Sequence, residues 1–507
     1  MEPAKRIIIN TIAQYAKSIL NIFLSFYSTR LILEALSIAE YGIFSVVGGT
    51  VAMLGFITNA LAITTQRYIS IHIGNTKTEY LRKIFINSLF LHIIIALGLL
   101  LILLSLWGLL ANDILNIDIS RLITAKYVYI LTVLMLALTI ISTPFKALLI
   151  THENIIYISI IESIDGVIKV LFAIWLLNLN ANIDKLLIYT IMMTTITTLN
   201  MLAFLIYANL KYKECSIKIH HKSIDYKILR KLISFAGWST YGMGAVAGRN
   251  QGTAVVLNHY FGTTINAAYG LATQVNGAIS FVVSSILNSM NPQIMQAEGD
   301  GNRQKALRLA EKQSKFSAAL LGIVAIPLII EMPDILSFWL KNIPEYTCLF
   351  CRFVLIALLC DQITLGLNAI NQAIGNIRNY IIITYTPKLL FLPIIYFYLA
   401  AGGNILNSMI IYVSIEIITA VLRLPYTKKR AGISITQYFY NVIFPLIPLF
   451  FIISYISYII TYVYSGTYRF IITILLSCIC GLITLFIFTL SKEEKEHVKR
   501  ITKKLRR

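Results

Sequence analysis

The sequence predicts an all-α membrane protein with about fourteen transmembrane helices, arranged as two six-helix lobes followed by two further helices. Composition is the first reason, because 57% of the 507 residues are hydrophobic and only 13% are charged. Soluble domains carry about 25% charged residues. The second reason is that apolar runs of about 18 residues or more, long enough to span a membrane, recur along the chain. The third reason is an internal repeat of short polar motifs.

The repeat relates a polar stretch in the middle of the chain, from about Arg249 to Asn302, to a weaker copy near its start. Tyr41-Gly42 precedes Tyr269-Gly270 by 228 residues, and Gly74-Asn75 precedes Gly301-Asn302 by 227. Two similar halves are typical of membrane transporters in which one half moves against the other. We therefore expect two equivalent lobes, and we expect the Asn, Gln and Gly residues of the central stretch to provide hydrated lining and close helix packing.

The apolar runs place the helices in order along the chain. They lie near residues 8–33, 41–63, 84–110, 125–149, 155–177, 184–208, 231–257, 266–290, 316–338, 347–370, 378–400, 404–424, 434–462 and 469–490. The resulting divisions are an N-lobe at 1–210, a basic linker at 211–230, a C-lobe at 231–430, two further helices within 431–490 and a basic tail at 491–507. Helices of this length fill more than half the chain, which leaves no room for a soluble domain.

Lysine and arginine are concentrated in alternate loops, a pattern that predicts cytoplasmic N- and C-termini. The pattern places the linker and the tail in the cytoplasm, and it also assigns Arg67 and Arg423 to cytoplasmic segments. The net charge of +20 therefore reflects membrane topology, and we expect no nucleic-acid partner. The first apolar segment has no small-residue cleavage site, so we interpret it as the first helix and not as a signal peptide.

Catalytic and metal sites are not expected. The C-x-x-C pair Cys348 and Cys351 has no second pair or histidine cluster, so core or interfacial thiols are favoured over a zinc site. His220-His221 has no nearby acid or cysteine, which favours a solvated basic linker. The predicted external loops are too short to hold the catalytic residues of a membrane glycosyltransferase or polymerase, and no Walker motif is present. We therefore expect a non-enzyme without metal or cofactor.

Charged residues inside the predicted helices are the candidate functional residues, because burying a charge in a membrane is costly. Arg249 lies in mid-helix with no acidic residue within four positions, so its guanidinium requires water or an anion. A guanidinium matches phosphate through two parallel hydrogen bonds. A cation-exporting pocket would instead be acidic or aromatic. If they face inward, a cationic cavity is formed by Lys17, Lys169, Arg249 and Lys388.

Several of these charges have a structural alternative. Arg30 and Glu34 are four residues apart and can pair on one helix face or extend to the interface. Asp165 and Lys169 either neutralise each other in the same way or line a hydrated cavity. Lys146 and Arg352 lie near helix ends, from which they can reach the headgroups. The candidates for a coupling-ion site or for ion pairs are the carboxylates of Asp165, Asp361, Glu416 and Glu34.

Two groups of motifs carry a family resemblance. Thr29-Arg-Leu-Ile-Leu33 followed by Tyr41-Gly42 resembles the first-helix motif of Wzx-type polysaccharide (O-antigen) flippases. The stretch from Asn266 to Asn276, with Asn291-Pro-Gln-Ile294 and Gly299-Asp300, resembles their second-lobe motif. These flippases belong to the multidrug/oligosaccharidyl-lipid/polysaccharide exporter superfamily.

The resemblance implies a V-shaped, MATE-like transporter of the bacterial inner membrane that works by alternating access. It implies a polyprenyl-diphosphate-linked oligosaccharide as cargo, such as a repeat unit of O-antigen, capsule or exopolysaccharide. It also implies membrane lipids and the polymerase and glycosyltransferases of the same pathway as partners. The diphosphate would be held by the cationic lumen residues Arg249, Lys17, Arg30, Lys169 and Lys388.

Three alternatives remain at this stage. The main one is a cation-coupled drug or metabolite antiporter of the same superfamily, against which the basic lumen argues. A membrane glycan polymerase is disfavoured by the short external loops. A non-transporting scaffold would leave the intramembrane cations without a role.

Overall fold

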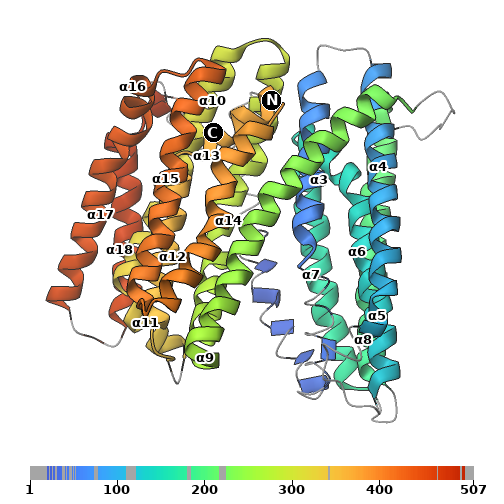
Figure 1. Ribbon diagram of the computed structural model, residues 1–507, viewed down its shortest axis with the longest axis horizontal. Coiled ribbons are helices and arrows are strands. Elements are labelled where there is room, and N and C mark those ends of the chain that lie inside the picture. The colour runs from blue at the N-terminus through green and yellow to red at the C-terminus, as the bar shows by residue number, and fades with distance from the viewer. Residues whose placement is uncertain are drawn as a thin grey trace, which may run out of the picture. The chain divides into compact units, whose positions relative to one another are not determined.

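The computed structural model is an all-helical membrane protein (Figure 1). Backbone groups surrounded by lipid must form their hydrogen bonds within the protein, and a helix forms them within its own segment. The structure describes scattered positions between 17 and 54 and then residues 55–73, 78–109, 121–179, 184–215, 224–340, 343–464, 466, 468–491 and 494–496. No strand occurs in these ranges.

The described residues form two compact units, which divide within helix α9 (Tyr226–Gly299) between Gly244 and Ala245. The N-terminal unit contains the start of α9 and the elements α3 (Gly55–His72), α4 (Thr78–Ser105), α5 (Trp107–Leu109), α6 (Leu122–Thr151), α7 (Ile155–Leu177), α8 (Lys185–Lys211) and η3 (Lys213–Cys215). The domain boundaries drawn from the sequence stay a prediction, and linker residues 216–223 lie outside the described ranges.

The C-terminal unit contains the remainder of α9 and all later elements. These are α10 (Arg303–Ile330), α11 (Met332–Trp339), α12 (Thr347–Gln362), α13 (Leu365–Ile374), α14 (Arg378–Ala400), α15 (Ile405–Ala431), α16 (Ile435–Tyr438), η5 (Phe439–Ile443), α17 (Phe444–Val463), α18 (Arg469–Thr484) and η6 (Leu485–Thr489).

Eight helical segments in the described part of the chain are long and apolar enough to cross a membrane. They are α4, α6, α8, α10, α14, α15, Ile435–Val463 and Arg469–Thr489, and the bent pair α12 and α13 forms a ninth if it is one span. Helix α7 matches the predicted helix at 155–177 but carries three charges, and α9 covers the predicted helices at 231–257 and 266–290. The predicted fold class is confirmed, although most of the helix expected at 8–33 lies outside the described residues.

The central polar stretch contains two helical halves and a turn, as the sequence predicts. Gly262 interrupts the helical backbone of α9 with φ 80° and ψ −174°, between the two predicted helices. A left-handed φ of this kind is open to glycine without strain. After α9 ends, Gly301 adopts φ +74°, and the side chain of Asn302 accepts a hydrogen bond from the backbone N–H of Lys305 at the start of α10.

Three predicted helices differ from the observed ones. Helix α3 continues to His72, beyond the predicted end at 63, because its polar residues are satisfied inside the helix bundle. For example, Ser70 donates to Thr151 on α6 (3.4 Å), and Arg67 stacks on the ring of Phe235 (4.8 Å). The predicted helix at 316–338 is broken at Glu331, just before Pro333 in the first turn of α11. The predicted helix at 347–370 is bent by 47° between α12 and α13.

The last two helices, α17 and α18, are part of the C-terminal unit and pack against α10. Their contact depends on small residues, since a Cβ atom at Gly322 would lie 2.3 Å from the ring of Phe450. Gly481 similarly faces Ile323 of α10. The hydroxyls of Ser457 and Ser477 are 2.8 Å apart and join α17 to α18. The pair that has no counterpart in the repeat is thus packed into a shared core.

Helices α10 and α13 are in close contact at Gly366, where only glycine fits. A Cβ atom there would lie 1.8 Å from the carbonyl oxygen of Ala310. The backbone N–H of Gly366 donates to the Ser314 hydroxyl at 2.8 Å. The two backbones are therefore in direct contact.

We expect Gly366→Ala to lower the free energy of unfolding by about 1–3 kcal/mol, the usual cost of overpacking a core. Thermal unfolding of the purified protein in detergent measures this change. Gly270→Ala in α9 is the matched control, because a Cβ atom there meets nothing within 4 Å. Equal effects of the two substitutions would contradict the close approach at Gly366.

Glu214 on η3 connects the end of α8 to the end of α6. Its carboxylate lies 2.6 Å from Nε2 of His152, whose ring stacks on Tyr212 with centroids 4.1 Å apart. Burial raises the pKa of the Glu214 carboxyl, but the hydrogen bond and charge of His152 outweigh burial and hold the pKa below its ordinary value. A lowered carboxyl pKa stabilises the folded state above the ordinary pKa, and this stability is lost as pH falls through the folded pKa.

We therefore expect Glu214→Gln to lower the melting temperature at neutral pH and to lose this effect in acid. The difference from the wild type shrinks as pH falls through the lowered pKa, because protonated Glu214 resembles glutamine. Melting curves in detergent at neutral and acidic pH test the prediction. Glu345→Gln, at an exposed position, is the control. A difference that does not change with pH would show that the carboxylate charge is not responsible.

Candidate functional site

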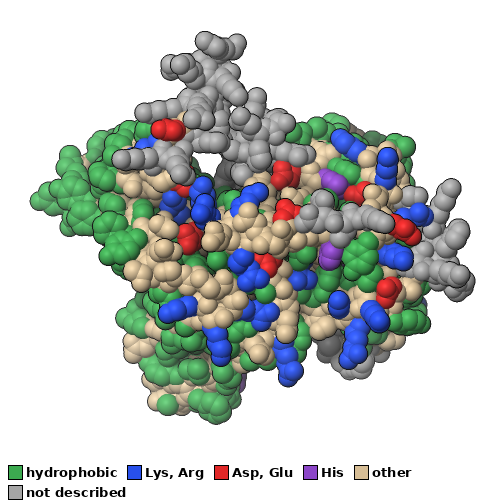
Figure 2. Space-filling view, turned by 90° about the horizontal axis from the view of Figure 1, so that it is seen from above, with side chains coloured by type: hydrophobic (Ala, Val, Ile, Leu, Met, Phe, Trp, Pro, Cys, Tyr) green, Lys and Arg blue, Asp and Glu red, His purple; other side chains and the backbone are tan. Residues whose placement is uncertain are grey.

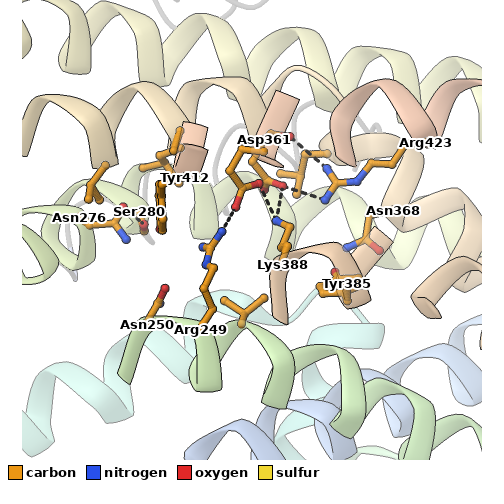
Figure 3. Close-up of a pocket in the computed structure, with 16 residues that line it drawn as sticks. Arg249, Asn250, Asn276, Ser280, Asp361, Asn368, Tyr385, Lys388, Tyr412 and Arg423 are labelled. Carbon is orange, nitrogen blue, oxygen red and sulfur yellow. Dashed lines mark hydrogen bonds and ion pairs between the residues drawn. The ribbon is translucent and has the colours of Figure 1, made fainter. Parts of the chain in front are cut away.

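A polar cavity of about 260 Å³ lies inside the C-terminal unit (Figure 3). Five helices form it: α9, α12, α13, α14 and α15. Its lining combines charged, amide and hydroxyl side chains with an apolar wall, and consists of Val246, Arg249, Asn250, Asn276, Ser280, Val354, Ala357, Leu358, Asp361, Leu365, Asn368, Tyr385, Lys388, Tyr412, Glu416 and Arg423.

The charged residues of the cavity form a continuous chain of ion pairs. Arg249 on α9 pairs with Glu416 on α15. Lys388 on α14 bridges the two carboxylates, with Nζ 2.8 Å from Oε2 of Glu416 and 3.2 Å from Oδ1 of Asp361. Arg423 closes the chain, with Nη2 2.8 Å from the same Asp361 oxygen. Three cations thus face two carboxylates, which leaves one excess positive charge.

Four of these five charges are almost fully removed from the surface, and the side chain of the fifth, Asp361, is 21% exposed. Arg249 is 5% exposed, Lys388 4%, Glu416 3% and Arg423 1%. Isolated ions at such depth would cost several kcal/mol each, so their mutual pairing is what permits burial. The pairing is incomplete, because Nε of Arg249 and Oδ1 of Asn250 have no hydrogen-bond partner among the described residues. The cavity therefore retains free hydrogen-bonding capacity next to a guanidinium.

Small residues on α9 bring Arg249 into position. A Cβ atom at Gly252 would lie 2.6 Å from the side chain of Leu392 on α14, and one at Gly248 would contact Leu389. The guanidinium of Arg249 also lies 4.4 Å from the ring centre of Tyr412. Glycine in this stretch thus serves close packing of α9 on α14, as the sequence predicts.

A second cluster lies in the N-terminal unit, around α7. Glu162 accepts from Lys17 at 2.6 Å and from Lys146 of α6 through its other oxygen. One turn further on, Lys169 pairs with Asp165 at 2.8 Å, and Asn200 of α8 donates to the same carboxylate at 3.2 Å. The Glu162 cluster also has one more cation than carboxylates.

The structure brings together some of the predicted site residues and separates others. Arg249, Lys388, Asp361 and Glu416 meet in the cavity of the C-terminal unit. Lys17, Lys169 and Asp165 lie in the N-terminal unit, and Asp165 forms the predicted pair with Lys169. Glu34 is exposed, whereas Arg30 lies outside the described residues, so their pairing stays a prediction.

One expectation about an individual cation is wrong, and two further cations have partners that the sequence does not predict. Arg249 is not a lone guanidinium, because Glu416 reaches it from 167 positions along the chain. Lys146, which is expected to reach the headgroups, pairs with Glu162. Arg352 donates from Nε to the carbonyl of Ile329 at 2.9 Å, where α10 ends.

The role of Arg423 is missed by the loop pattern, which assigns this residue to a cytoplasmic segment. Besides its ion pair it donates to Oγ1 of Thr364 at 3.2 Å, so it is a buried member of the site. Its spacing of seven residues from Glu416, two helical turns on one face, is the signal that sequence could have provided.

Comparison with known proteins gives a likeness of fold. No family model matches the chain, and no curated protein matches its sequence. An outward-facing multidrug resistance MATE family transporter of the MOP superfamily superposes with a TM-score of 0.71 at 13% identity, over 85% of this chain and 96% of that one. The chain has the MATE fold.

Two further solved structures extend this likeness. A MATE in complex with MaL6 gives a TM-score of 0.70 at 12% identity, over 85% of this chain and 97% of that one. A MOP superfamily transporter from Pyrococcus furiosus gives 0.69 at 13% identity, over 85% and 96%. The latter is described as having a binding pocket of reverse polarity that suggests a different function.

We expect Arg423→Met to lower the free energy of unfolding by about 3 kcal/mol, because it leaves the Asp361 carboxylate short of a buried partner. Lys428→Met, on an exposed part of the same helix, removes the same charge and is the matched control. Thermal unfolding in detergent provides the comparison. Equal stability of the two variants would show that Arg423 does not hold the network together.

Proposed function

We propose that the protein is a membrane transporter for an anionic cargo and, specifically, a flippase for polyprenyl-diphosphate-linked oligosaccharides. The excess positive charge of the cavity in the C-terminal unit is the observation that carries the proposal. An uncompensated charge in a low-dielectric interior is costly, and an anion that enters the cavity relieves this cost. The MATE fold supports the assignment to a transporter, and the motif resemblance supports the choice of cargo.

Arg249 is the proposed diphosphate ligand of the C-terminal unit. Its guanidinium can donate two parallel hydrogen bonds to phosphate oxygens, and its Nε has no partner among the described residues. Lys388 adds a second cation that already contacts both carboxylates. The amides of Asn250, Asn276 and Asn368 offer further polar contacts at the cavity wall. In the N-terminal unit, the Glu162 cluster offers a second cationic site through Lys17.

The two carboxylates act in this proposal as resident counter-ions. Without cargo, Glu416 pairs with Arg249 and Lys388, while Asp361 pairs with Lys388 and Arg423, and one positive charge remains in excess. An arriving diphosphate competes with Glu416 for Arg249, and Lys388 remains within reach of the displaced carboxylate. Cargo binding therefore changes the charge of the cavity. Moving one elementary charge across the membrane is worth about 2.3 kcal/mol per 100 mV, so the membrane potential can bias an alternating-access cycle.

The cellular setting belongs to the same proposal. The protein would lie in the bacterial inner membrane with both termini in the cytoplasm. Its partners would be the lipid-linked cargo, membrane lipids, and the polymerase and glycosyltransferases that act before or after translocation. Whether glycosyltransferase genes flank the coding gene is a direct genomic check.

A cation-coupled drug or metabolite antiporter is the second candidate. It is favoured by the carboxylates of Asp361 and Glu416, which line the same cavity and could hold a proton or a cationic substrate. The likeness of fold to a multidrug resistance transporter also supports this second candidate. The two candidate functions predict opposite changes in substrate affinity when the charge of the cavity is changed.

We expect Arg249→Gln to weaken binding of a polyprenyl diphosphate to the purified protein about ten- to a hundredfold, and Glu416→Gln to strengthen it. The first variant removes a charge-assisted hydrogen bond worth about 1.5–3 kcal/mol, and 1.4 kcal/mol is a factor of ten in Kd. The second removes the resident competitor for Arg249. Fluorescence titration with the lipid in detergent measures both values of Kd.

Arg352→Gln is the control, since Arg352 lies in the same unit outside the cavity lining. Loss of fold would weaken binding in both test variants, and melting curves would identify it. A cationic dye that binds Glu416→Gln more weakly and Arg249→Gln more tightly would favour the antiporter. Unchanged diphosphate affinity in Arg249→Gln would exclude this residue as the phosphate ligand.

A further inference from the structure

A second hollow lies on the C-terminal unit, between the neighbouring helices α14 and α15. It encloses about 500 Å³, and most of its lining is apolar. Ile382 and Ile383 of α14 form one wall, and Leu422 and Pro425 of α15 form the other. The groove thus resembles a slot for a hydrocarbon chain on the outside of the helix pair.

The same groove has polar groups beside this apolar lining. They are the amide of Asn379, the hydroxyl of Tyr426 and the ammonium of Lys429. Tyr426 is held in place, because its ring lies 5.6 Å from that of buried Tyr380 and its hydroxyl accepts from Arg430 at 3.4 Å. Lys429 is exposed and makes no hydrogen bond or ion pair with any described residue.

We propose that this groove binds one anionic phospholipid, with the lipid phosphate at Lys429 and an acyl chain along Ile383 and Leu422. The occupant must be amphipathic, because the site joins an apolar slot to a free cation. Anionic headgroups are attracted to Lys and Arg near the membrane surface by about 1 kcal/mol per residue. Figure 2 shows such side chains gathered on the face of the molecule that lies at the top of Figure 1, where α15 ends.

The apolar surface continues beyond the groove along both helices. Leu390 of α14 is 51% exposed, and Ile418 and Val421 of α15 are 51% and 57% exposed. An acyl chain that leaves the groove therefore stays on apolar surface. In contrast, a free phosphate ion would leave this surface uncovered, which favours a lipid as the occupant.

The positive charge of Lys429 can also be explained without a bound lipid, and the same explanation applies to Lys428. Lys428, Lys429 and Arg430 all lie in the last turn of α15, where cations favour the helix dipole and mark a cytoplasmic loop. Lys428 is exposed like Lys429 but does not line the groove. The two lysines therefore separate general attraction to a membrane from a specific site.

A lipid bound in the groove would contact the same helices that line the cavity. Leu422 directly precedes Arg423, and α14 carries Lys388, so the walls of the groove belong to the helices that hold the ion-pair network. A lipid in the groove would brace α14 against α15. This inference is independent of the cargo proposed above.

The test compares Lys429→Gln with Lys428→Gln by native mass spectrometry of the purified full-length protein. The probes are phosphatidylglycerol and phosphatidylcholine, each added to detergent-solubilised protein. We expect one phosphatidylglycerol bound in preference to phosphatidylcholine, about tenfold weaker in Lys429→Gln and unchanged in Lys428→Gln. Leu422→Trp, which fills the slot, should remove the bound lipid, whereas Ile447→Trp, at an exposed apolar position of α17 outside the groove, should retain it.

Several outcomes overturn the proposal. Equal losses in the two lysine variants would indicate diffuse attraction to surface charge. Equal binding of the two lipids would indicate an apolar slot without a headgroup site, and displacement by inorganic phosphate would indicate a simple ion site. A groove that binds polyprenyl diphosphate and not phosphatidylglycerol would belong to the cargo path instead. Melting curves identify any variant that fails to fold.

Discussion

The charge balance of the C-terminal unit depends on two carboxylates that are each shared between cations. Glu416 lies between Arg249 and Lys388, and Asp361 lies between Lys388 and Arg423. Removal of a carboxylate leaves buried cations underpaired, and removal of a cation takes an ion pair from a buried carboxylate, so a change to any single member of the network disturbs its neighbours. Its members come from α9, α12, α14 and α15, so the same contacts that neutralise charge also fix how these helices pack. Binding chemistry and fold stability therefore meet in one set of residues.

The sequence predicts most of the helices because the thickness of the membrane sets the length of an apolar run, and polar loops separate one run from the next. The helices from residue 84 onward and the break near Gly262 follow from this pattern. The break at Glu331 and the bend between α12 and α13 do not, because they interrupt runs that remain apolar throughout. The extension of α3 to His72 is equally hidden, since its polar residues are satisfied by partners on other helices.

The candidate site is predictable only where its contacts are local. The pair of Asp165 and Lys169 follows from a spacing of four residues on one helix face. The partners Arg249 and Glu416 are 167 residues apart, so only the fold reveals that a seemingly isolated guanidinium is neutralised. Arg423 is hidden for a different reason. It is followed by three loop-marking cations, and its own burial shows only when α15 is placed beside α12.

The proposal of an anionic cargo depends on these charges and not on the fold. Chains with the MATE fold include one described as a multidrug resistance transporter and one described as having a pocket of reverse polarity. In this chain both the cavity network and the Glu162 cluster contain one more cation than carboxylates. A cationic substrate would add to an existing excess, whereas a diphosphate would offset it. Because the carboxylates already occupy the cations, an anionic cargo must displace them, and this exchange links cargo binding to a change of charge on which the membrane potential can act.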